Sequence, residues 1–171
     1  MIQRVFDARK QRFGSPCVAK IVNSALTESL HHPKPQPKPT GRLLALDLGT
    51  KRVGLAVSDE LRLTVRPLMI LERRSWKHLL SDVKEQINTL GVTGLVVGLP
   101  LNMDGSEGPA AAEARRLTEN FRRSLSVPVY LQDERLTSEE ATSRANGASA
   151  DAIDAKAAAV ILEDFLGRQS R

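Results

Sequence analysis

The sequence is short of cysteine and of long apolar runs, and each shortage excludes a class of protein. Cys17 is the only cysteine in 171 residues, which excludes an internal disulfide framework and favours a reducing compartment. No run of 18 apolar residues occurs, so we expect no helix that crosses a membrane. The apolar stretch over residues 17–26 contains too many polar residues for a secretory signal. We therefore expect a cytoplasmic protein without a membrane partner.

The body of the chain also lacks net charge, although the whole chain carries a formal charge of +5. Residues 1–40 hold seven Lys and Arg against two acidic residues, which accounts for the whole excess. The remaining 131 residues carry 18 basic and 18 acidic side chains. The positive charge is thus a property of the N-terminal segment and does not indicate a basic nucleic-acid-binding domain.

Residues 1–40 differ in composition from the rest of the chain. Proline alternates with polar residues over 33–39, which favours an extended polyproline II conformation. Residues 1–13 carry a weak amphipathic helical pattern. We expect a disordered or weakly helical extension over 1–40 and a folded domain over 41–171. A solvated tail, an organellar transit peptide and an auxiliary RNA-binding arm are alternative roles for the extension.

From Arg42 onward the apolar pattern is typical of an α/β domain. Four short apolar runs predict strands, over residues 43–46, 53–57, 94–99 and 128–132. A further strand is expected over 64–71, at an edge or with a bend, because Pro67 has no amide hydrogen to donate. The early strands follow one another as hairpins, whereas helices separate the later ones, so we predict a mixed sheet.

Helices are predicted between and after the later strands. Ser75 and Gly91 flank a segment whose apolar residues recur at three- and four-residue spacing. A second helix is expected to begin near Pro109. Its predicted buried residues are Ala110, Ala114, Leu117 and Phe121. An alanine-rich helix is expected over residues 151–166.

Three acidic residues stand at the ends of apolar segments or on an apolar face, where a carboxylate is costly to bury. Asp47 ends the first strand, Glu134 follows the last strand, and Asp154 lies on the apolar stripe of the final helix. An isolated buried charge costs several kcal/mol, so each acid needs a cation or backbone donors. Strand alternation turns Asp133 and Glu134 to opposite faces, and we favour Glu134 as the one that faces Asp47.

Each acid also has a purely structural explanation. Asp47 can cap the turn that follows it, Glu134 can pair with Arg135, and Asp154 can stabilise the start of its helix. If the three converge instead, their oxygens suit Mg²⁺ or Mn²⁺, with Asp47 as the bridging ligand. Two such ions about 4 Å apart would activate a water and stabilise the leaving oxygen of a phosphodiester.

Basic and polar residues near these acids are candidates for contact with a substrate. The candidate substrate-binding residues are Lys51, Arg52, Asn102 and Arg135. Ordinary surface roles stay equally open for the three basic side chains.

Four blocks of sequence, in order, resemble the YqgF (RuvX) family. They are LLALDLGTKRVGLAVSD at residues 43–59, VVGLPLNMDG at 96–105, DERLTS at 133–138 and IDAKAAAVIL at 153–162. The resemblance covers residues 41–167 and implies an RNase H-like fold with strand order 3-2-1-4-5 and helices on both faces. It also implies a nuclease that matures the 5′ end of pre-16S ribosomal RNA, and the family was first proposed to resolve Holliday junctions.

Transfer of the family motifs points to Asp47, to the block Asp133-Glu134-Arg135 and to Asp154, and leaves open which acid of the block is the metal ligand. With Glu134 favoured, we expect Asp47, Glu134 and Asp154 to be the catalytic and metal-binding residues. The chain departs from the family before Asp154, because residues 143–151 are short and hold Arg144 as their only basic side chain. Affinity for nucleic acid is therefore expected to be lower there than in other family members.

Three other functions stay open beside a metal-dependent nuclease acting on structured RNA. Residues 46–50 also resemble the phosphate-binding opening of actin-like ATPases and sugar kinases, which need two such domains. A non-catalytic RNA-binding module would keep the fold without cleavage. A junction resolvase would cut four-way DNA as a homodimer, whereas the RNA nuclease is expected as a monomer or homodimer.

Overall fold

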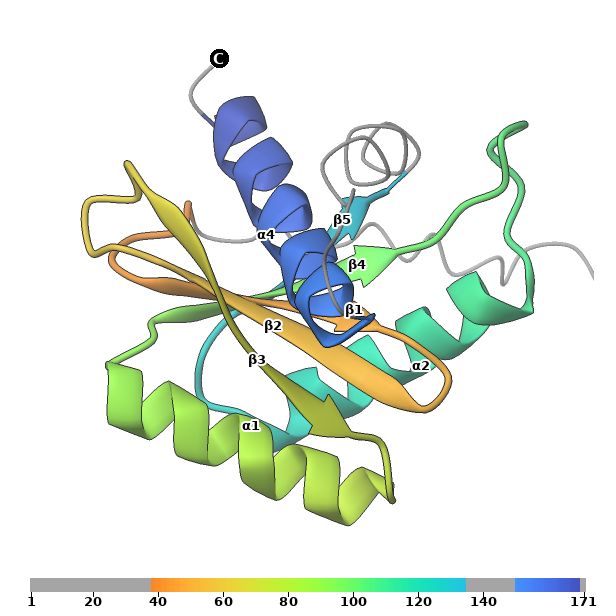
Figure 1. Ribbon diagram of the computed structural model, residues 1–171, viewed down its shortest axis with the longest axis horizontal. Coiled ribbons are helices and arrows are strands. Elements are labelled where there is room, and N and C mark those ends of the chain that lie inside the picture. The colour runs from red at the N-terminus through yellow and green to blue at the C-terminus, as the bar shows by residue number, and fades with distance from the viewer. Residues whose placement is uncertain (1–37, 135–149, 170–171) are drawn as a thin grey trace, which may run out of the picture. The chain divides into compact units, whose positions relative to one another are not determined.

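The computed structural model of the protein describes residues 38–134 and 150–169 (Figure 1). Its elements are β1 (Leu43–Leu48), β2 (Arg52–Ser58), β3 (Val65–Glu72), α1 (Trp76–Leu90), β4 (Gly94–Leu99), α2 (Pro109–Ser124), β5 (Val129–Asp133) and α4 (Ala150–Gln169). The role expected for residues 1–37 lies outside the described part of the chain. No helix within that part is long and apolar enough to cross a membrane.

The five strands form one sheet in the order β3-β2-β1-β4-β5. β1 pairs antiparallel with β2 and parallel with β4, β2 pairs antiparallel with β3, and β4 pairs parallel with β5. The mixed sheet and the RNase H-like strand order are therefore confirmed. Because β1, β4 and β5 run in the same direction, their carboxyl ends meet at one edge of the sheet.

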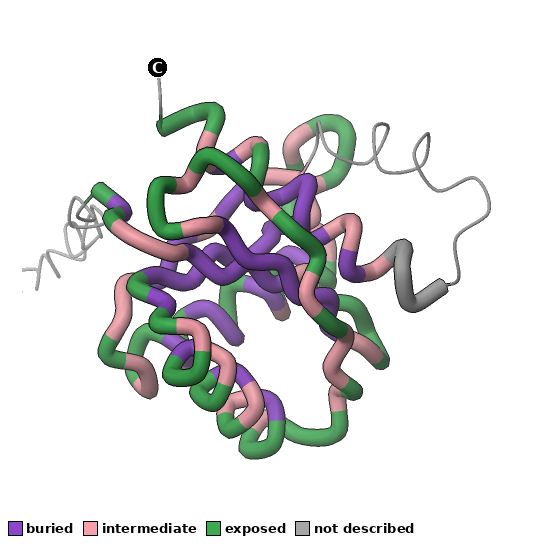
Figure 2. The backbone as a smooth tube through the Cα atoms, turned by 60° about the vertical axis from the view of Figure 1, so that its left-hand side comes forward, coloured by how far each residue is buried: buried purple, intermediate pink, exposed green. Residues whose placement is uncertain are grey.

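Helices cover both faces of the sheet, with α1 and α2 on one face and α4 on the other (Figure 1). Leu44 and Leu46 of β1 pack toward α1 and α2, whereas Leu43 and Ala45 pack toward α4. This alternation leaves β1 buried on both faces, as the purple strands at the centre of Figure 2 show. Asp47 continues the Leu43 and Ala45 series and therefore belongs to the face that α4 covers.

The helix boundaries follow local signals in the sequence. The Ser75 hydroxyl accepts a hydrogen bond from the His78 amide, and Gly91 ends α1 in the left-handed conformation, with φ 62°. Pro109 is the first residue of α2, as predicted.

One predicted core position of α2 was wrong. Ala110 is exposed, and Ala111 is buried in its place against Leu99 of β4. Ala114, Leu117 and Phe121 are buried as expected, together with Thr118. The apolar face of α2 therefore begins one residue later than the run of three alanines suggests, because the run itself does not fix which alanine meets the sheet.

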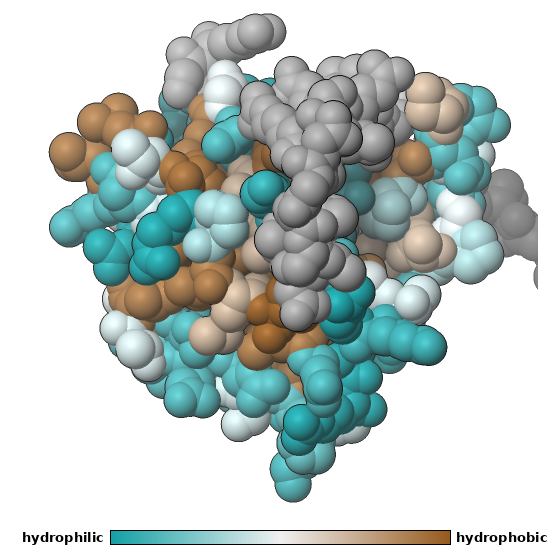
Figure 3. Space-filling view, in the orientation of Figure 1, coloured by the Kyte–Doolittle hydropathy of each residue, from teal (hydrophilic) through white to brown (hydrophobic). Residues whose placement is uncertain are grey.

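β3 is an edge strand that carries two features which discourage pairing with another chain. Pro67 lies opposite Ala56 where the register shifts between Leu55 and Ala56, as a β-bulge requires. The prediction was an edge position or a bend, and the structure shows the edge position together with an irregularity beside Pro67. The hairpin between β2 and β3 exposes Leu61 and Leu63, and Figure 3 shows apolar side chains at this upper left end of the molecule.

α4 approaches the sheet most closely at Gly54 of β2. A Cβ atom built on Gly54 would overlap the backbone carbonyl of Asp154. Gly54 is also the register partner of Asp47 on the neighbouring strand. Glycine at this position lets the first turns of α4 rest directly on β2, which brings Asp154 over the end of β1.

We expect Gly54→Ala to lower the free energy of unfolding by about 1–3 kcal/mol, because the added methyl group must displace helix backbone. Gly167→Ala, within α4, is the matched control, since nothing lies within 4 Å of a Cβ built there. Urea unfolding followed by circular dichroism measures both. Equal stabilities for the two variants would contradict the close approach at Gly54.

Candidate active site

Asp47 lies near the carboxyl end of the central strand, under the first turns of α4. Burial raises the pKa of Asp47 from 3.8 to about 6, and the negative charge of Asp154 adds to the rise. A turn-capping aspartate accepts hydrogen bonds best when it is ionised, but burial at this position destabilises the ionised form. Asp47 therefore lies where a cation would be stabilising.

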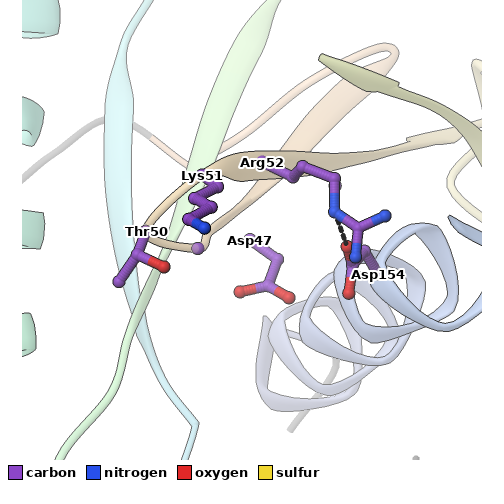
Figure 4. Close-up of a pocket in the computed structure, with 7 residues that line it drawn as sticks. Asp47, Thr50, Lys51, Arg52 and Asp154 are labelled. Atoms are coloured by element: carbon purple, nitrogen blue, oxygen red, sulfur yellow. Dashed lines mark ion pairs between the residues drawn. The ribbon is translucent and has the colours of Figure 1, made fainter. Parts of the chain in front are cut away.

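Asp154 faces Asp47 from α4 and is neutralised by a neighbouring arginine. Its Oδ2 lies 3.1 Å from Nε of Arg52, and the side chain of Asp154 is 33% exposed (Figure 4). The two aspartates line one pocket of about 280 Å³. The other lining residues are Gly49, Thr50, Lys51, Arg52 and Gly54. Two acids and two basic side chains thus surround one open cavity.

Glu134 follows β5 and is held beside Asp47 from another direction. Its backbone amide donates to the carbonyl of Leu99, 3.2 Å away. Burial raises the pKa of Glu134 from 4.5 to about 8, with repulsion from Asp47 and then Asp133 adding to the rise. In the absence of a cation, the Glu134 carboxyl therefore keeps a proton at neutral pH.

Gly98 of β4 provides the space for the Glu134 side chain. A Cβ atom on Gly98 would overlap Oε1 of Glu134 and would lie 2.8 Å from Cδ1 of Ile161. The carboxyl group thus occupies the volume that a side chain at position 98 would fill. Gly54 and Gly98 both lie inside apolar strands, where a glycine often marks a close approach of another group.

The carboxylates of Asp47, Glu134 and Asp154 are suitable ligands for a divalent cation. In the structure they interact as two pairs that share Asp47. Asp47 interacts with Asp154 and with Glu134, and each contact raises a carboxyl pKa. Within residues 38–134 and the described side chains of α4, no three acidic, histidine or cysteine residues form a ready-made metal cluster. Carboxylate oxygens are the ligands that Mg²⁺ and Mn²⁺ prefer, and a bound cation would remove the repulsion.

The candidate substrate-binding residues have different surroundings. Lys51 lies exposed at the rim of the pocket, whereas Arg52 is engaged with Asp154 (Figure 4). Asn102 does not line the pocket, and its Nδ2 donates to Oγ of Ser106, 2.8 Å away, within its own loop. Arg135 lies outside the described residues.

Sequence reasoning missed three residues that shape the site. Thr50 lines the pocket from the turn after β1, and Gly54 and Gly98 make room for Asp154 and Glu134. The two glycines carry a signal, because glycine interrupts an otherwise apolar strand in each case. Thr50 carries no such signal in the sequence, since its place in the pocket depends on the conformation of the turn after β1.

The raised pKa of Glu134 predicts how stability changes with pH in EDTA. Its folded-state pKa lies above the unfolded value of 4.5, so the stabilisation is complete below about pH 4.5 and is lost by about pH 8. The raised pKa of Asp47 adds a loss between about pH 4 and 6. The expected total decrease in the free energy of unfolding is on the order of a few kcal/mol.

Glu134→Gln is expected to flatten this profile and to exceed the wild type in stability at pH 8. Glu85→Gln, at an exposed position of α1, is the control and should keep the wild-type profile. Urea unfolding from pH 4 to pH 9 measures all three proteins. Parallel profiles for the wild type and Glu134→Gln would show that this carboxyl group does not titrate as described.

Comparison with known proteins places the chain in a family. A family model described as "RuvX: Holliday junction resolvase" matches residues 41–168. A protein of Anaeromyxobacter sp. (strain K), named "Putative pre-16S rRNA nuclease", is 48% identical over 135 residues, which cover 75% of this chain and 98% of the relative. A protein of the same name from Myxococcus xanthus (strain DK1622) is 43% identical over 133 residues, covering 73% and 87% of the two chains.

Solved structures with similar topology are more distant. Thermus thermophilus RuvC in complex with a Holliday junction substrate has a TM-score of 0.49 at 16% identity, covering 75% of this chain and 95% of RuvC. The fowlpox virus Holliday junction resolvase has a TM-score of 0.45 at 12% identity, covering 74% and 99%. The family match and the close relatives confirm the resemblance seen in the sequence: the chain belongs to the RuvX family of nucleases.

Proposed function

We propose that this protein is a divalent-metal-dependent nuclease that hydrolyses phosphodiester bonds in a ribosomal RNA precursor. The relatives at 43–48% identity carry the name of a pre-16S rRNA nuclease. The observation that carries the proposal is Asp47, a carboxylate on the central strand whose pKa is raised by burial and by Asp154. Cleavage of the 5′ end of pre-16S ribosomal RNA in the cytoplasm is the specific reaction we assign.

Asp47, Glu134 and Asp154 are the residues that would hold Mg²⁺ or Mn²⁺. The ion would supply activation of a water molecule and stabilisation of the leaving oxygen. Glu134 holds a proton at neutral pH until a cation replaces it, because its pKa is about 8. Arg52 keeps Asp154 neutralised and oriented toward the pocket. Lys51 at the rim is suited to contact a phosphate of the substrate backbone.

Resolution of four-way DNA junctions is the second candidate, because the matching family model carries that description. The same acids and the same ion chemistry would cut either substrate. A resolvase would need a dimer, since a junction presents two equivalent strands for cleavage. The two functions therefore differ in substrate and assembly rather than in the chemistry of the site.

Asp47→Asn is expected to lower the rate of Mn²⁺-dependent cleavage about a hundredfold or more, because it weakens the central cation ligand. Glu85→Gln, an acid-to-amide change far from the pocket, should cleave like the wild type. The assay uses a pre-16S RNA fragment and a four-way DNA junction in parallel, so it also selects between the two substrates. Equal cleavage by the wild type and Asp47→Asn would refute the proposed site.

We also propose that residues 41–171 form the nuclease domain and that residues 1–40 are an extension. Arg62 donates to the carbonyl of Pro39 and Thr93 donates to the carbonyl of Thr40, so contacts with the domain begin two residues before position 41. A truncation that tests the extension therefore has to stop before Pro39. Removal of residues 1–37 should change the melting temperature by no more than about 2 °C and keep the cleavage rate at saturating RNA. A weaker affinity with a flatter salt dependence would identify the extension as an RNA-binding arm. Loss of cooperative unfolding would show that the domain needs this segment.

A further inference from the structure

The turn between β1 and β2 carries Lys51, an exposed cationic side chain that lines the pocket, and it is contacted by an arginine that follows β3. Residues 49–51 form this turn, and Lys51 extends from it beside Asp47 (Figure 4). The turn is tight, because a Cβ on Gly49 would lie 2.7 Å from the carbonyl oxygen of Arg52. Within it, the Gly49 amide donates a hydrogen bond to the Asp47 carbonyl at 3.2 Å.

Arg73 joins this turn to two other elements. The last register pair of β2 and β3 is Arg52 with Glu72, which places Arg73 next to Lys51. The Arg73 amide donates to the Lys51 carbonyl at 2.8 Å, and its Nη1 donates to the Gly49 carbonyl at 3.1 Å. Its Nη2 forms an ion pair with Glu113 of α2. One residue therefore fixes both ends of the turn against a helix.

Glu113 completes the arrangement by holding two arginines. Arg116, one turn further along α2, donates to Glu113 at 2.7 Å and 2.8 Å. These bonds and the contact with Arg73 lower the pKa of Glu113, so it stays ionised. The Arg73 side chain is only 20% exposed, with its guanidinium shared between a carbonyl and a carboxylate. Such charge-assisted bonds hold the Arg73 side chain in one position, so Arg73 is better suited to fix the turn than to contact a phosphate. We call the contacts of Arg73 with Gly49 and Glu113 the Arg73 brace.

We propose that Arg73 is a positioning residue, which holds the turn so that Lys51 meets a phosphate of the nucleic-acid substrate beside Asp47. The inference rests on the proposed function, because it assigns Lys51 to the substrate. Arg73 does not line the pocket of Asp47 and Asp154, and its guanidinium is engaged by the Gly49 carbonyl and by Glu113. Its effect on binding must therefore pass through Lys51.

A double-mutant cycle on RNA binding tests this dependence. The affinity of the full-length protein for a fluorescent pre-16S RNA fragment is measured by anisotropy in EDTA, where no cleavage occurs, at several salt concentrations. We expect Lys51→Gln and Arg73→Gln each to weaken binding about threefold to tenfold and to reduce the salt slope by about one. Their combination should bind no more weakly than Lys51→Gln alone. Losses that multiply in the double variant would overturn the proposal, as would wild-type affinity of Arg73→Gln.

Three further variants separate positioning from charge and from folding. Arg74→Gln removes a neighbouring arginine that pairs with exposed Glu72, and it should bind within about twofold of the wild type. Arg73→Lys should keep most of the loss, because one ammonium cannot replace the forked contact to Gly49 and Glu113. Wild-type RNA affinity of Arg73→Lys would contradict the proposed positioning role of Arg73.

Glu113→Gln gives the sharpest distinction and serves if Arg73→Gln fails to fold. Removal of a negative charge strengthens RNA binding if electrostatics alone matter. If the Arg73 brace positions Lys51, Glu113→Gln instead weakens RNA binding, because Arg73 loses its ion pair with Glu113. Weaker binding supports the proposal, and tighter or equal binding overturns it. Because binding is read in EDTA, absence of cleavage by the wild type would refute the proposed nuclease while leaving this cycle interpretable.

Discussion

Repulsion among carboxyl groups at the carboxyl end of β1 is the constraint around which this part of the protein is built. Asp47 lies between Asp154 on α4 and Glu134 after β5, and the pKa of Asp47 rises to about 6 and that of Glu134 to about 8. Such an arrangement reduces stability in the absence of a compensating charge. The proposed nuclease function explains its presence, since a divalent cation bound there would offset the repulsion between the carboxylates.

Neighbouring residues at this edge of the sheet provide the space and the opposite charge that the three acids require. Parallel pairing of β1, β4 and β5 brings their ends together, and strand alternation turns Asp47 to the face that α4 covers. Glycines 54 and 98 leave the volume that Asp154 and Glu134 require. Arg52 neutralises Asp154 at 3.1 Å, while Arg73 and Glu113 hold the adjoining turn. Stability elsewhere comes from the apolar layers on both sides of the sheet.

Most of the fold could be predicted from the sequence, because periodic apolar residues and local caps specify it. Ser75, Gly91 and Pro67 act through their own backbone chemistry, so their effects are readable without a structure. Ala110 was misplaced, since three consecutive alanines leave the rotation of α2 to tertiary packing. The acids could be selected as costly charges near apolar segments. The ion pair of Asp154 with Arg52, and the contacts of Arg73 with the turn, could not be predicted, because they depend on contacts between distant segments.

The central claim is that these acids bind a divalent cation, and the anomalous scattering of Mn²⁺ in a crystal of the full chain tests it most directly. The account predicts a peak about 2 Å from a carboxylate oxygen of Asp47, with Glu134 or Asp154 as a second ligand. A Mn²⁺ ion bound elsewhere, or none at Asp47 at millimolar concentration and pH 8, would contradict it.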